Sequence, residues 1–118
     1  MIRTILLNTF LFLGLAGAVG CSRAQVVCGV ICECEHCSDE TEIRTCNDLA
    51  TQEDVADAYG CGDAWTTYTV CVEEQGTCDA REARFSTEDE NNNDRCGDER
   101  GALFSCIDAA SARDGIRF

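Results

Sequence analysis

The sequence predicts a small all-α, disulfide-rich protein, with an antiparallel helical hairpin, one further helix and a preceding cysteine-rich irregular segment. Ten of the 97 residues after Cys21 are cysteines, whereas only 15 are Ile, Leu, Val or Phe. So few large apolar side chains cannot hold a fold by themselves, so we expect about five disulfides to cross-link it. The chain is also too short for more than one small domain.

The part of the chain from 47 to 118 is expected to be helical, and 28–46 to be a cysteine-rich cluster. The first helix is expected to begin at Thr51, which resembles an N-cap followed by an acidic residue, and to end at Gly60. Val55, Ala58 and Tyr59 have the i, i+3, i+4 spacing of one helix face. We therefore predict that these three residues face the core.

Two segments then repeat one cysteine spacing: CGDAWTTYTVC from Cys61 to Cys71, and CGDERGALFSC from Cys96 to Cys106. Ten residues of α-helix rise about 15 Å in nearly three turns, so both cysteines of a segment lie on one side. A short helical turn from Asp79 and a polar loop over 86–94 are expected between the two helices. Their predicted buried residues are Cys61, Ala64, Trp65, Tyr68, Cys71 and Val72, then Cys96, Leu103, Cys106, Ile107 and Ala110; Phe104 is also expected to be core.

If these two helices run antiparallel, their cysteines lie level in pairs, with about 5–6 Å between Cα atoms. The predicted bridges are Cys61–Cys106, Cys71–Cys96 and, from the start of the preceding helix, Cys46–Cys78. Cys28, Cys32, Cys34 and Cys37 are left to pair among themselves. Of their three pairings, any with Cys32–Cys34 is the least favourable, because one intervening residue strains the ring.

The first 20 residues have the three regions of a secretory signal peptide. Arg3 makes the start basic, the apolar run from Ile5 to Gly20 is short for a membrane span, and its last residues are small. The next residue is Cys21, and AVGC resembles the lipobox of bacterial lipoproteins, which implies lipid attachment at Cys21. Eleven cysteines are an odd number, and removing Cys21 leaves ten that can form five disulfides. Residues 21–27 would then be the lipid anchor and tether.

The charge limits the partners of the exported chain. After the signal, 22 acidic residues stand against 8 arginines, a net charge of −14. Nucleic acid is excluded as a partner, because phosphate binding needs clustered cations. Adhesion to anionic lipid is disfavoured, so the membrane would be reached through the anchor alone. Ser22 after the lipid-carrying cysteine implies, by resemblance to other lipoproteins, an outer-membrane location.

The segment CECEHC offers a second hypothesis, a soft-metal protein that binds Zn or Cu. Its ligands would be Cys28, Cys32, Cys34, His36 and Cys37. In an oxidising compartment, however, such closely spaced thiols usually form disulfides. Thiol–disulfide catalysis by the Cys34–Cys37 motif is disfavoured, since the chain has no proline and no room for the fold that it needs. One histidine also gives no convincing catalytic set, so we predict no enzyme and no cofactor.

The chain as a whole resembles the small Cys-rich lipoproteins of myxobacteria and their relatives. Like them it has a signal, a lipobox, a cluster such as CGVICECEHC, and helices with nine residues between cysteines. That family has no assigned activity, so the resemblance implies a fold and a cell-envelope location only. The paired nine-residue gaps are also similar in spacing to the coiled-coil–helix–coiled-coil–helix proteins. We therefore expect a non-catalytic, lipid-anchored envelope protein with a structural or binding role.

Overall fold

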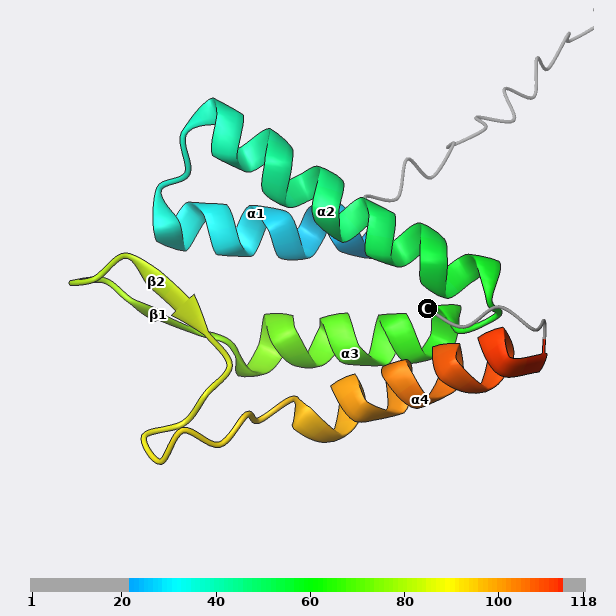
Figure 1. Ribbon diagram of the computed structural model, residues 1–118. Coiled ribbons are helices and arrows are strands. Elements are labelled where there is room, and N and C mark those ends of the chain that lie inside the picture. Colours follow the sequence, from blue (N-terminus) through cyan, green and yellow to red (C-terminus); the bar gives the residue numbers. More distant parts are fainter. Residues whose placement is uncertain (1–21, 114–118) are drawn as a thin grey trace, which may run out of the picture.

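The computed structural model describes residues 22–113, which form four helices and one two-stranded β-hairpin (Figure 1). The predicted disulfide-rich helical fold is confirmed, with a small sheet in addition. The predicted signal and Cys21 lie outside the described residues, as does Gly115, the glycine that the sequence predicts to end the last helix. The elements are α1 (Arg23–Glu35), α2 (Asp39–Ala58), α3 (Gly62–Gln75), β1 (Thr77–Asp79), β2 (Arg84–Ser86) and α4 (Gly97–Arg113).

The segment 28–46, expected to be irregular, is mostly helical: α1 covers its first part and the start of α2 its last part. Ser22 is the N-cap of α1 and accepts a hydrogen bond from the Gln25 backbone N–H at 3.2 Å. The helix ends at His36, whose φ of 48° is in the left-handed region and whose backbone N–H bonds to the Cys32 carbonyl oxygen. Its cysteines are therefore ordered on a helix rather than in an irregular cluster.

Helix α2 begins at Asp39, twelve residues before the expected N-cap at Thr51. The actual cap is Ser38, which accepts from the Thr41 backbone N–H at 3.3 Å. Acidic residues in the first turn stabilise the positive end of the helix dipole. Its buried residue is Ala56. Of the predicted face, Val55 is 36% exposed and Ala58 is exposed, whereas Tyr59 is partly buried and packs against the core. Gly60, with a φ of 70°, follows the helix end as expected.

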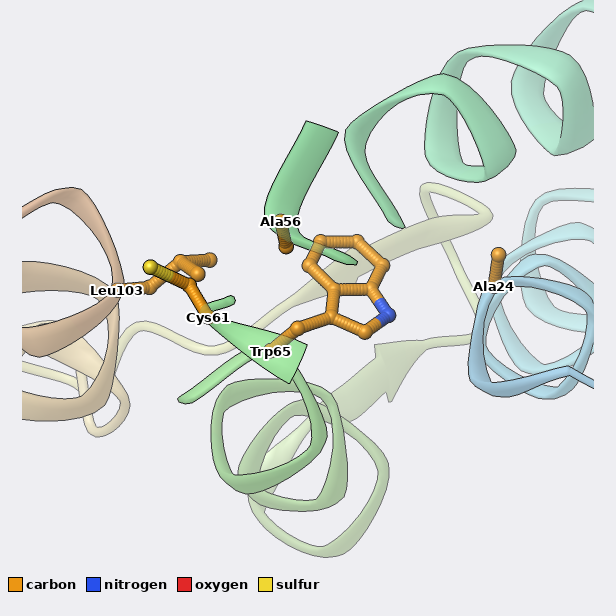
Figure 2. Packing of buried hydrophobic residues seen from close by; sticks show 5 residues of the cluster. All are labelled: Ala24, Ala56, Cys61, Trp65 and Leu103. Carbon is orange, nitrogen blue, oxygen red and sulfur yellow. The ribbon is translucent and has the colours of Figure 1, made fainter. Parts of the chain in front are cut away.

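The helices are arranged as two antiparallel pairs, α1 with α2 and α3 with α4 (Figure 1). Helix α3 contacts all three other helices, while α2 and α4 make no comparable contact with each other. One core cluster surrounds Trp65 and consists of Ala24, Ala56, Cys61, Trp65 and Leu103 (Figure 2). A second contains Val27, Val72 and Cys96. The tertiary contacts therefore centre on α3.

The short helical turn expected from Asp79 is wrong, because that segment is the tip of a β-hairpin. Strands β1 and β2 pair antiparallel with Cys78 opposite Phe85. The Asp79 carboxylate accepts hydrogen bonds from the backbone N–H groups of Arg81 and Glu82, which fixes a turn instead of capping a helix. The hairpin places Cys78 against the end of α1.

Two of the predicted disulfides are present, and both join α3 to α4. Cys61–Cys106 has a Cα separation of 6.0 Å and Cys71–Cys96 one of 5.8 Å. These values lie in the range expected for level cysteines on antiparallel helices. The nine-residue gaps thus give the register of this helix pair.

The predicted bridge Cys46–Cys78 is wrong. Cys46 pairs with Cys28 across the α1–α2 pair, at a Cα separation of 5.2 Å, and Cys78 pairs with Cys34 at 5.7 Å. The prediction failed because it began α2 too late and gave α1 no regular structure. The remaining bridge, Cys32–Cys37, closes the turn after α1 at 4.9 Å. The first four cysteines therefore do not pair only among themselves.

Candidate functional site

The cysteine segment proposed for a soft metal has no free thiol. Cys28, Cys32, Cys34 and Cys37 are all in disulfides. A disulfide sulfur is not the thiolate that zinc or copper needs, so these bridges argue against metal binding there. His36 is exposed at the end of α1. Among residues 22–113, no group of three or more His, Cys, Asp or Glu side chains is placed to hold a metal ion.

The polar loop before α4 is organised by its own carboxylates. Asp89 accepts hydrogen bonds from the backbone N–H groups of Asn91 at 2.8 Å and Asn93 at 2.9 Å. These bonds, with the one from Asn93 first, hold the pKa of Asp89 below its usual range. Because the carboxylate is used by neighbouring amides, the loop is a self-bonded turn.

Next to it, Arg100 forms a polar cluster between the loop and α3. Its guanidinium lies 2.6 Å from the Asp94 carboxylate, 3.4 Å from the Tyr68 hydroxyl and 5.6 Å from the centre of the Tyr68 ring. The hydrogen bond with Tyr68 is the main cause that raises the pKa of Arg100. The pKa of Asp94 is lowered, chiefly because its carboxylate accepts from the Cys96 backbone N–H. The cluster joins the loop to the α3–α4 pair.

An apolar groove lies between α2 and α4. Its volume is about 340 Å³, and Trp65 of α3 contributes to its lining. Val55 lines the α2 side, and Phe104 and Ile107 line the α4 side, with Leu103 beside Trp65. Thr51, Gln52 and Asp108 complete the lining. We call this feature the apolar groove.

Phe104 is the most exposed large apolar residue in the lining of the groove. It is 58% exposed, contrary to the expectation that it belongs to the core, whereas the preceding Leu103 is 4% exposed. One residue along a helix is a rotation of 100°, so the Phe104 side chain points well away from the direction in which Leu103 enters the core. The helical phase of α4, in which Leu103 points inward, could have indicated this from the sequence.

One carboxylate fixes the aromatic side chain of the groove. The Trp65 indole Nε1–H donates to Glu53 Oε2 at 2.7 Å, and the Ala24 backbone N–H donates to the same oxygen at 2.9 Å. Figure 2 shows the indole ring beneath Ala56, with its nitrogen directed toward Ala24. Glu53 thus joins α2, α3 and the first turn of α1. No local pattern in the sequence indicates this role of Glu53, because its partners are remote in the chain.

Comparisons with protein-family models, with curated proteins and with solved structures gave no match. None of the helices in the described range 22–113 is both long and apolar enough to cross a bilayer. The five disulfides are compatible with an exported protein.

Proposed function

We propose that the protein is a non-catalytic lipoprotein of the cell envelope, anchored in the outer membrane through Cys21. The observation that carries this proposal is that all ten cysteines from Cys28 to Cys106 are paired. Cys21 is then the one cysteine without a disulfide assignment, and it follows the lipobox-like AVG. Lipid on its sulfur would account for the odd cysteine of an exported chain.

The start of the folded domain suits a short anchor. Ser22 caps α1, so this helix starts directly after Cys21. The net charge of −14 would keep the domain from adhering to anionic headgroups, leaving the acyl chains as the membrane contact. Two or more acyl chains give stable attachment, whereas one gives only marginal binding.

The experiment is expression of the full chain in a bacterium that processes lipoproteins, followed by fractionation and intact mass measurement. The wild type should begin at Cys21, carry the mass of acyl groups and sediment with outer membranes. Cys21→Ser should be released or remain as uncut precursor. The matched control, Cys32→Ser with Cys37→Ser, also removes cysteines and should still be lipidated.

A wild-type protein that begins at Cys21 with an unmodified thiol would refute the anchor, as would cleavage at another residue. Sedimentation of lipidated protein with the inner membrane would refute only the outer-membrane location.

A further inference from the structure

The apolar groove is a preformed concavity in a molecule that has few large apolar side chains. Scattered exposed apolar residues are ordinary on protein surfaces. Here, however, Val55, Phe104 and Ile107 line one hollow together with the Trp65 ring. Concave apolar surfaces of this kind are typical binding sites.

The walls of the groove are held in place by bonds outside it. The Cys61–Cys106 disulfide joins α3 to α4, with Cys106 adjacent to the groove residue Ile107. The Trp65 indole is fixed by its hydrogen bond to Glu53. A site that is ordered before binding loses less conformational entropy when its partner arrives.

The charges around the groove are negative. Asp108 is the charged residue of its lining. Asp48 precedes Val55 by seven residues on α2, nearly two full turns, and so lies on the same side of that helix. This pattern favours a ligand with cationic groups beside its apolar part.

The arginines of α2 and α4 do not neutralise this rim. Arg44 pairs with Glu40 at 3.0 Å, and Arg100 is bound by Asp94 at 2.6 Å. Arg113 follows Phe104 by nine residues, two and a half turns, so it lies on the opposite face of α4.

We propose that the apolar groove binds a cationic amphipathic helix of another protein, with apolar side chains over Val55 and Phe104 and a Lys or Arg beside Asp108. Docking a helix into a groove between helices is a common mode of peptide recognition. A second copy of this chain is disfavoured, because both copies would carry a net charge of −14. The inference goes beyond the lipid anchor and does not depend on it.

The chain contains its own reporter, since Trp65 is its one tryptophan. The probe is a synthetic 18-residue helical peptide without tryptophan, with Leu and Phe at i, i+3, i+4 and i+7 and Lys on the opposite face. It would be titrated into the full mature protein, in detergent where the protein carries lipid. A saturable change in Trp65 fluorescence, with a matching calorimetric isotherm, is expected.

Two peptides and two variants test the chemistry. A scrambled peptide of equal charge, and an amphipathic peptide with Glu in place of Lys, should bind at least about tenfold more weakly. Phe104→Asp should weaken binding of the cationic peptide about tenfold or more. It should leave the fold intact, because the Phe104 side chain is already exposed. Asp108→Lys should weaken the cationic peptide and strengthen the Glu peptide.

The matched control is Ile43→Asp, which places the same charge at a residue of α2 that is 62% exposed and does not line the groove. It should leave affinity unchanged. Equal binding by the scrambled peptide, or equal losses in Ile43→Asp and Phe104→Asp, would overturn the proposal. The proposal would also be overturned if sedimentation showed a dimer that the Phe104→Asp variant does not form. Binding to anionic vesicles that depends on Phe104, or peptide binding only after removal of residues 114–118, would overturn it as well.

Discussion

Removal of the Glu53 side chain should destabilise the protein more than its partial exposure suggests. In the Glu53→Ala variant, two donors lose their acceptor at once: the Trp65 indole N–H and the Ala24 backbone N–H. Trp65 is 2% exposed and Ala24 is fully buried, so water cannot readily replace the carboxylate. A buried donor without a partner costs about 1–3 kcal/mol, which gives about 2–6 kcal/mol for the two.

That loss is a large share of the free energy of unfolding of a small domain, about 5–15 kcal/mol. For a chain of this length it corresponds to a fall in Tm of about 10–30 °C. Thermal and urea unfolding, followed by far-ultraviolet circular dichroism under non-reducing conditions, would measure it. Trp65 fluorescence should shift in parallel, because the indole environment changes.

Two variants separate the hydrogen bonds from charge. Glu53→Gln keeps a side-chain oxygen that can accept both bonds and loses only a negative charge near the start of α1, worth about 0.3–1 kcal/mol. Replacing the exposed neighbour of Glu53, in the variant Asp54→Ala, removes the same charge from the same helix and should have little effect on stability. If Glu53→Gln were as unstable as Glu53→Ala, or if Glu53→Ala matched Asp54→Ala, the shared-acceptor explanation would be wrong.

Three further perturbations test the fold. Gly76→Ala should be destabilising, because its Cβ would collide with the Phe85 ring and lie 2.5 Å from the Val72 carbonyl oxygen; Gly29→Ala, inside α1 with open space around it, should stabilise by about 0.5–1 kcal/mol in urea unfolding. Asp94→Asn should lower the free energy of unfolding at pH 7. The difference from the wild type should shrink as the pH falls below about 3.9, since a carboxyl whose pKa is lowered by folding stabilises the fold only while it is ionised. A difference independent of pH would exclude this explanation. Full reduction should abolish helical circular dichroism at neutral pH, because five bridges worth about 2–4 kcal/mol each exceed the net stability of such a domain; retained helicity would mean that the core suffices.

Local patterns were enough to predict the α3–α4 pair. Its cysteine spacing requires two helices of matched length, and antiparallel packing then leaves one register in which Cys61 meets Cys106 and Cys71 meets Cys96. Two of the three buried residues of α3, Trp65 and Val72, followed from its 3.6-residue period, whereas the buried Thr69 was not predicted. These features depend on residues that are close in sequence or related by one symmetric geometry.

The rest of the disulfide pattern depended on contacts that no local pattern contains. Cys34 reaches Cys78 only because α1 packs on α3 and a β-hairpin bends toward the end of α1. Ser38 was a local N-cap signal for the start of α2, but it was missed because the many cysteines around it indicated an irregular segment. Once α2 began at Ser38, Cys46 lay opposite Cys28 instead of near Cys78.

The apolar groove likewise belongs to the tertiary structure. The sequence alone determined a small acidic, helical, cysteine-rich chain with a lipobox-like start, because composition and short motifs suffice for those properties. Only the packing decided that Phe104 faces outward and that Val55 lies across from it, with Trp65 in the lining between them. The reason is physical: the rotation of each helix about its axis is set by the buried residues of its neighbours, and a single-residue change of phase exchanges a core side chain for a surface one.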